Sequence, residues 1–280
     1  MDTGARVRVQ RPCTQAALIM ASNPIRAVLF DMGGTLEELY YDDVVRLEAA
    51  RGLRTLLRSL DLDPGMSAPE LKAAVARGMA AYQAWREETN VELSPERIWT
   101  EHILPDHGLA RERLAAAAEE LAFYYETHFY LRSLRTEARA AVETLHRRGF
   151  RLAVISNITS RGIVPSVLKD YGLAGCFEAV VTSTAYGRRK PDEGIFLEAA
   201  RLLGLPPAAC AYVGDTVSRD VIGAHRAGYG LAIQIRSFLT DKMDPPHESG
   251  PERSRAAVPD IVVKDLMEVI PAVGAGNRDG

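Results

Sequence analysis

An aspartate followed by a glycine-rich turn is the segment of this sequence best suited to chemistry. Asp31 is followed by Gly33, Gly34 and Thr35, and it directly succeeds the unbroken apolar run 27–30. An apolar run closed by turn residues predicts a strand buried on both faces, as in a parallel sheet. The carboxyl ends of such strands line the ligand-binding crevice of open α/β folds. A carboxylate there can be a nucleophile, a metal ligand or both, or it can simply cap the turn that follows.

Three later segments place polar side chains near the ends of further predicted strands. They contain Ser156 and Asn157, then Lys190 ahead of a predicted helix, and finally Asp215 and Asp220. These residue types suit phosphoryl transfer, because a phosphoryl group needs cations and hydrogen-bond donors around its oxygens. Lys190 offers a point charge and Ser156 a hydrogen bond, while carboxylates can hold a hard divalent cation such as Mg²⁺.

Strands alternate with helices through most of the chain, which predicts a parallel sheet with right-handed crossovers. The expected fold is therefore α/β, with a Rossmann-like parallel core. After the run 27–30, the expected strands cover 152–155, 179–181, 211–213, 231–235 and an edge strand at 261–263.

A long segment after the first strand has helical rather than α/β character. Leucines 53, 56, 57 and 60 have the spacing of one apolar helix face, and Ser67 with Glu70 forms a capping-box pattern. We expect an all-helical cap at 41–131, inserted into a core of 24–40 and 132–272 and hinged near Glu37–Tyr40 and Leu131–Arg135. The aromatic cluster of residues 123, 124, 125, 129 and 130 is assigned to the cap's core.

The ends of the chain and one late segment carry weaker patterns. Residues 1–23 resemble a weakly ordered extension, 237–258 a long polar loop and 273–280 a tail.

Composition restricts the class of protein. A net charge of −3 over 280 residues gives no indication of nucleic acid or an anionic membrane as partner. No apolar run approaches membrane-spanning length. The three cysteines fit neither a disulfide framework nor a zinc site, which favours a reducing, cytoplasmic location. We expect a monomer or homodimer that acts on a small molecule.

The four polar segments, taken in order, resemble the motifs of the haloacid dehalogenase-like hydrolase superfamily, in the form with a helical cap between the first and second motifs. The resemblance covers about residues 26–270. Each motif alone is weak, whereas four in the right order, each at a predicted strand end, are specific.

The resemblance implies a role for each matching residue. Asp31 would be the nucleophile and form an aspartyl-phosphate. Ser156 would bind the transferred phosphoryl group, and Lys190 would neutralise its charge. The implied substrate-binding residues are Gly34, Thr35, Ser156, Asn157 and Lys190. The implied cofactor is Mg²⁺. Asp31, Asp215 and the carbonyl of Gly33 would bind it directly, and Asp220 would support it through water or hydrogen bonds.

The sequence departs from the family pattern at Gly33. In the family's phosphatases this position is an aspartate that acts as general acid and base, a function typically worth about 10²–10⁴-fold in rate. Glycine can still offer its carbonyl to a metal, but it cannot transfer a proton. Either another group such as Glu37 or Glu38 replaces the acid, or the leaving group needs no proton, or the protein is slow or non-catalytic.

Several functions are compatible with these residues. The leading interpretation is a Mg²⁺-dependent phosphatase acting on a small phosphorylated metabolite. A metal-independent dehalogenase-like hydrolase would not need the missing acid, although Asp215 and Asp220 keep the metal pattern. A phosphonate hydrolase would need a cap lysine, and Lys72 is the only one in the predicted cap. A non-catalytic phosphate- or partner-binding module would use the same fold.

Overall fold

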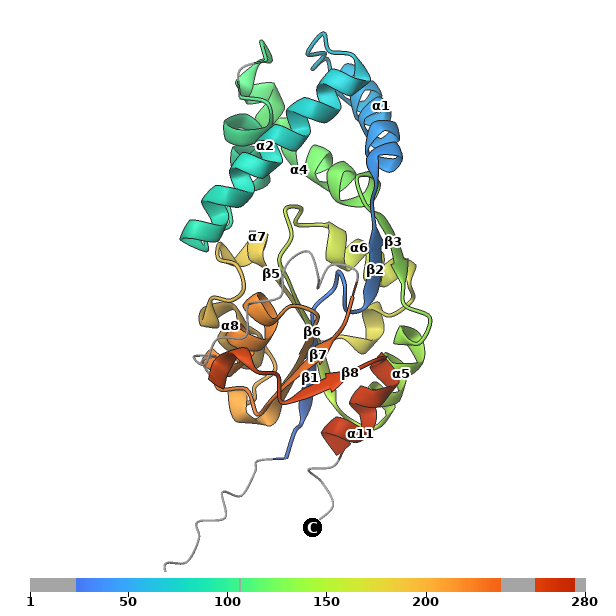
Figure 1. Ribbon diagram of the computed structural model, residues 1–280, viewed down its shortest axis with the longest axis vertical. Helices are drawn as coiled ribbons and strands as arrows, with labels where there is room; N and C mark the ends of the chain where they lie inside the picture. Colours follow the sequence, from blue (N-terminus) through green and yellow to red (C-terminus); the bar gives the residue numbers. More distant parts are fainter. Residues whose placement is uncertain (1–23, 106, 238–254, 275–280) are drawn as a thin grey trace, which may run out of the picture.

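A six-stranded parallel sheet forms the core of the protein. The computed structural model describes residues 24–105, 107–237 and 255–274, and its sheet has the strand order β5-β4-β1-β6-β7-β8 (Figure 1). The strands are β1 (Ala27–Phe30), β4 (Arg151–Ser156), β5 (Ala179–Thr182), β6 (Cys210–Gly214), β7 (Leu231–Ile235) and β8 (Ile261–Val263). All five neighbouring pairs are parallel, so the predicted α/β class is confirmed, and β8 lies at an edge as expected.

The position of β1 explains why the polar segments converge. This strand lies between β4 and β6, with Phe30 opposite both Val154 and Val213. Because the three strands are parallel, their carboxyl ends meet at the same edge of the sheet. Asp31, Ser156 and Asp215 each follow one of these paired residues by one or two positions, so all three lie at this edge.

Helices cover both faces of the sheet. Alternate residues of β1 point to opposite faces, so Val28 and Phe30 pack in one hydrophobic cluster and Ala27 and Leu29 in another. The first cluster is completed by α5 (Ala138–Arg147), α6 (Ile163–Asp170) and α11 (Val269–Gly274). The second is completed by α8 (Glu193–Leu202) and α9 (Ile222–Arg226). A short helix, α7 (Ser183–Tyr186), directly follows β5.

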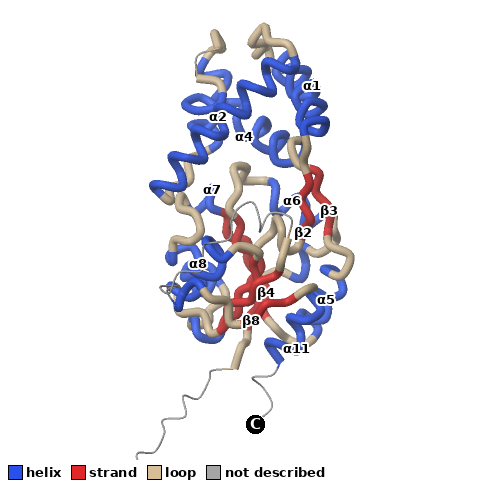
Figure 2. Tube along the Cα trace, in the orientation of Figure 1, coloured by secondary structure: helices blue, strands red, loops and turns tan. Residues whose placement is uncertain are grey.

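The inserted segment consists of helices and lies beyond the carboxyl edge of the sheet (Figures 1 and 2). It contains α1 (Asp43–Ser59), α2 (Ala68–Thr89), α3 (Pro95–Arg97), a π-helical turn (Ile98–Ile103) and α4 (Arg111–His128). These helices have a hydrophobic core of their own, which includes Leu53, Leu71, Trp99 and Leu121. The predicted capping box of Ser67 and Glu70 begins α2. None of the helices in the described ranges combines the length and apolar character needed to cross a membrane.

Two strands connect the helical segment to the sheet. The predicted hinges form an antiparallel ribbon of β2 (Glu37–Tyr40) and β3 (Leu131–Leu134). The exact boundaries of core and cap stay a prediction. The predicted extension 1–23, most of the predicted loop and the tail beyond 274 lie outside the described residues.

Gly78 provides a test of how the cap is packed. A Cβ atom at this position of α2 would lie 2.5 Å from the carbonyl oxygen of His102 and from Cα of Ile103. Replacing a helical glycine by alanine normally gains about 1 kcal/mol. Here we expect Gly78→Ala to lower the free energy of unfolding by about 1–3 kcal/mol, because backbone must move. Chemical denaturation of the variant would measure the change.

The control is Ala80→Gly, at an exposed position of the same helix, which should cost about 1 kcal/mol from helix propensity alone. A gain in stability for Gly78→Ala would contradict the close approach of α2 to residues 102–103.

Candidate active site

The ammonium group of Lys190 lies at the centre of the polar residues at the sheet edge. Its Nζ atom is 2.7 Å from Oδ1 of Asp31 and 2.7 Å from Oδ1 of Asp220, and the side chain is 2% exposed. It also contacts the Tyr212 hydroxyl at 2.8 Å and the carbonyl oxygen of Ile155 at 3.2 Å. The structure thus brings together three residues that lie far apart in the sequence.

Asp220 is held from both sides. Thr216 donates to its Oδ2 atom from the backbone N–H at 2.9 Å and from the hydroxyl at 2.6 Å, while Lys190 binds Oδ1. The Tyr212 hydroxyl is 3.3 Å from the same Oδ1. Sequence reasoning missed Thr216 and Tyr212. The only signal for them was their position in and beside the segment that carries both aspartates.

Three carboxylates form a cluster that could hold a metal ion. Asp31, Asp215 and Asp220 are buried, and one ligand oxygen from each lies within 4.8 Å of the others. Burial raises the pKa of Asp31 to about 6, against the charge of Lys190. Burial and then the charges of Asp220 and Asp31 raise the pKa of Asp215 to about 8. At Asp220 burial acts in the same direction, but Lys190 and Thr216 outweigh it and lower the pKa.

This donor set fits a hard divalent cation. Carboxylate oxygens are the ligands that Mg²⁺ takes in proteins, usually few in number and completed by water. A cation among the three groups would offset both their burial and their mutual repulsion.

The glycines after Asp31 occupy tight positions. Gly34 has φ of +89°, and a Cβ atom there would overlap the Asp215 carboxylate, so this position requires glycine. A Cβ atom at Gly33 would lie 2.8 Å from Cδ1 of Leu39 and 3.9 Å from Nη2 of Arg132. An acidic side chain at Gly33 would therefore have to displace Leu39, and it would face a guanidinium group.

The other predicted substrate-binding residues differ in their surroundings. Ser156 is buried and lines the same cavity as Asp31. Asn157 also lines it, but its amide oxygen accepts from the backbone N–H of Lys190 at 2.9 Å and its amide nitrogen donates to the Lys190 carbonyl at 3.1 Å. Asn157 thus positions Lys190. Thr35 is fully buried and, like Gly34, does not line that cavity.

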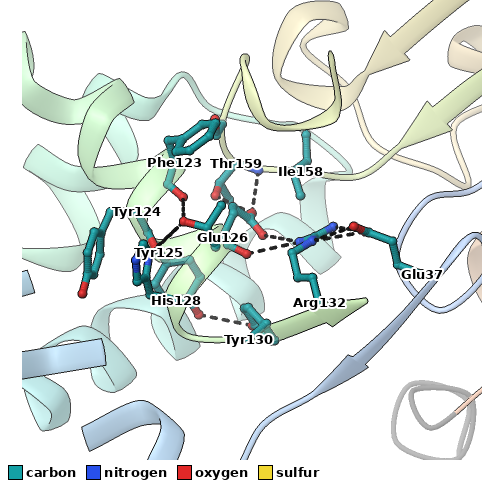
Figure 3. A network of polar contacts seen from close by, with 12 residues as sticks. Glu37, Phe123, Tyr124, Tyr125, Glu126, His128, Tyr130, Arg132, Ile158 and Thr159 are labelled. Atoms are coloured by element: carbon teal, nitrogen blue, oxygen red, sulfur yellow. Dashed lines mark hydrogen bonds and ion pairs between the residues drawn. The ribbon is translucent and has the colours of Figure 1, made fainter. Parts of the chain in front are cut away.

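Glu37 belongs to a polar network in the ribbon (Figure 3). This fully buried carboxylate accepts two hydrogen bonds from Nε and Nη2 of Arg132, at 3.1 and 2.6 Å to Oε2, and one from the Tyr171 hydroxyl at 2.8 Å. Nη1 of Arg132 lies 3.6 Å from Glu126, which accepts from the backbone and hydroxyl of Thr159. Glu38 is exposed. Neither Glu37 nor Glu38 lines the Asp31 cavity, so the suggested replacement of the missing acid finds no support.

The cavity above Asp31 has a volume of about 280 Å³ and is walled by core and cap. Its cap-side residues include Arg46, Met79, Gln83, Arg86, Tyr125 and Tyr130. The predicted aromatic cluster is thus partly core and partly cavity wall. Lys72 is not among the lining residues and instead pairs with Asp43 at 2.6 Å.

Comparisons with known proteins agree on the family. A family model described as haloacid dehalogenase-like hydrolase matches residues 25–228. A phosphoserine phosphatase from Thermus thermophilus is 33% identical over 87% of this chain and 90% of its own length. A glyceraldehyde 3-phosphate phosphatase from Methanopyrus kandleri is 27% identical over 88% of this chain and 97% of its own.

Solved structures share the fold. A 2-haloacid dehalogenase from Pseudomonas syringae pv. tomato superposes with a TM-score of 0.60 at 23% identity, covering 90% of this chain and 98% of that one. A phosphatase from Thermococcus onnurineus has a TM-score of 0.57 at 22% identity, covering 89% and 98%. The matched motifs, the parallel sheet and the family model together show that this chain belongs to the haloacid dehalogenase-like hydrolases.

Proposed function

We propose that this hydrolase is a Mg²⁺-dependent phosphatase that cleaves a small phosphorylated metabolite through an aspartyl-phosphate on Asp31. The observation that carries the proposal is the buried Lys190 ammonium, which lies 2.7 Å from both Asp31 and Asp220. These two carboxylates form a cluster with that of Asp215. A dehalogenase needs the nucleophile but not a metal cluster. Two of the relatives described above are also named as phosphatases.

Each residue has a defined task in this reaction. An Asp31 oxygen attacks phosphorus and the bond to the leaving oxygen breaks, which gives an aspartyl-phosphate. Water then cleaves that intermediate, releasing inorganic phosphate and restoring the carboxylate. Lys190 balances charge on Asp31 and on the phosphoryl oxygens, and Ser156 donates a hydrogen bond to them.

The metal would be held by Asp31, Asp215, Asp220 and the Gly33 carbonyl. When bound, Mg²⁺ would offset the charge on the phosphoryl oxygens. Asn157 and Thr216 contribute by fixing Lys190 and Asp220 in place.

The first prediction concerns the nucleophile. Asp31→Asn should abolish phosphatase turnover, because an amide cannot attack phosphorus, while circular dichroism and thermal unfolding remain close to those of the wild type. Asp170→Asn makes the same substitution at an exposed position and should leave turnover unchanged. Turnover by Asp31→Asn at the wild-type rate would remove Asp31 from the mechanism.

The second prediction concerns the metal. A chelator should abolish hydrolysis of an aryl phosphate and added Mg²⁺ should restore it. Asp215→Asn should raise the Mg²⁺ concentration needed for half-maximal activity. Steady-state assays across a Mg²⁺ titration would measure both effects. Turnover of a 2-haloacid that survives the chelator would instead support the dehalogenase alternative.

The third prediction concerns the missing acid. Gly33→Asp should raise kcat for an alkyl phosphate by about 10-fold, because the new carboxyl could protonate the departing oxygen. The gain should be at or below the low end of the range for general acids, since Arg132 would favour the ionised form of the carboxyl. An aryl phosphate should respond less, because its leaving group needs no proton. The ratio of the two kcat values is the measurement.

The matched control is Gly33→Asn, which has the same size but no acidic proton. An equal gain with Gly33→Asn would show that packing against Leu39, and not proton transfer, is responsible.

A further inference from the structure

We propose that the cap side of the cavity binds a second anionic group of the substrate, between the guanidinium groups of Arg46 and Arg86 and the hydroxyls of Tyr125 and Tyr130. The inference rests on the proposed function for the position of the phosphoryl group at Asp31. It narrows the substrate to a phosphate ester that carries a carboxylate or a second phosphoryl group.

Two arginines of the cavity wall have no carboxylate partner among the residues that the structure describes. Arg46 of α1 and Arg86 of α2 line the same cavity as Asp31, and neither makes an ion pair with a carboxylate in the described part of the chain. The four other cationic lining residues are each paired: Lys190 with Asp31 and Asp220, Arg132 with Glu37, Arg189 with Glu92, and Arg219 with Glu87. The lining therefore has two positive charges available to a ligand.

Aromatic rings hold both guanidinium groups in place. The Arg46 guanidinium lies 4.1 Å from the centre of the Tyr41 ring and 5.9 Å from that of Tyr130. The Arg86 guanidinium lies 5.2 Å from the Tyr82 ring, and its buried Nε atom has no hydrogen-bond partner. Stacking orients the planar guanidinium group, whose fork of N–H donors matches the geometry of carboxylate and phosphate.

Two tyrosine hydroxyls add a hydrogen-bond donor to the same cavity wall. The hydroxyls of Tyr125 and Tyr130 are 3.3 Å apart (Figure 3). One hydrogen serves this mutual bond, so the other can be donated to a ligand. Burial, and then the charge of Glu126, raise the pKa of Tyr130, while the hydrogen bond with Tyr125 and the charges of Arg46 and Arg86 act in the opposite direction. Both guanidinium groups therefore act on the same hydroxyl.

Neighbouring charges favour an anion at this position. The nearby carboxylate of Glu126 is already engaged by Thr159 and Arg132. Burial lowers the pKa of Arg189 to about 10 against the charge of Glu92, and Arg86 and Arg219 lower it further. Guanidinium groups thus repel one another across this wall, and a bound anion would relieve the repulsion.

The test measures binding separately from turnover. Full-length Asp31→Asn protein with Mg²⁺ is titrated by calorimetry with alkyl phosphates of graded chain length. Each is compared with the ω-carboxyalkyl phosphate and the α,ω-bisphosphate of the same length. We expect at least one carboxylated or bisphosphorylated compound to bind about 10- to 100-fold more tightly than its alkyl counterpart, the range for a charged hydrogen bond. The compound class that shows the gain identifies the anion.

Variants of the arginines connect the gain to this site. Arg46→Gln or Arg86→Gln in the same background should remove most of the gain and leave the affinity for plain alkyl phosphates within about twofold, since those lack the second charge. Arg46→Lys keeps the positive charge and should retain part of the gain. This variant separates the loss of charge from the loss of packing on Tyr41, which Arg46→Gln combines. The control Arg77→Gln removes an exposed charge from α2 and should have no effect.

Two results would overturn the inference. One is equal affinity for alkyl and carboxyalkyl or bisphosphate compounds at every length. The other is a loss of the gain in Arg77→Gln as large as in Arg86→Gln, which would reflect net charge only. An arginine-dependent gain without any wild-type turnover of phosphate esters would keep the anion site and reject the phosphatase function.

Discussion

The buried ammonium of Lys190 is the charge on which the electrostatics of the site depend. It lies between two carboxylates, and together with the Tyr212 hydroxyl and the Ile155 carbonyl it uses its full hydrogen-bonding capacity. A buried carboxylate without such a partner would be too costly to remain ionised. Lys190 therefore keeps Asp31 and Asp220 available as anions, and Asn157 keeps Lys190 in its place.

The surroundings of Gly33 are organised around a different carboxylate. Arg132 faces this glycine but is bound by Glu37, which is itself sequestered with Tyr171. The neighbourhood in which the family's phosphatases have an acid is thus apolar at Leu39 and cationic at Arg132. Neither Leu39 nor the Glu37-bound Arg132 can act as a general acid, so these surroundings favour a leaving group that needs no proton.

Local sequence signals sufficed for the sheet and for the polar residues at its edge. The apolar run before Asp31 predicted β1, and the parallel order predicted that Ser156 and Asp215 would leave the sheet near it. The ribbon was missed as strands because each strand has only four residues and begins or continues with charged groups. A buried carboxylate at Glu37 needs a cationic partner, and that partner is Arg132, which lies 95 positions later in the chain.

The cap wall was beyond sequence reasoning for a related reason. Arg46, Arg86 and Tyr130 come from separate elements and share no spacing, so nothing in one stretch of sequence marks them as neighbours. The aromatic cluster around Tyr125 has the composition of an ordinary core, and part of it is core. Only the tertiary arrangement separates the residues that pack from those that face the cavity.

The loop that follows Ser156 is held by carboxylates of the cap. Residues 159–161 donate to Glu126 and Glu119, and the Arg161 guanidinium binds Glu96 at 2.8 and 2.9 Å. Moving the cap away from the sheet would therefore break these contacts and release the loop that follows Ser156. Salt would screen the exposed pair of Arg161 and Glu96 and so weaken this attachment between cap and loop.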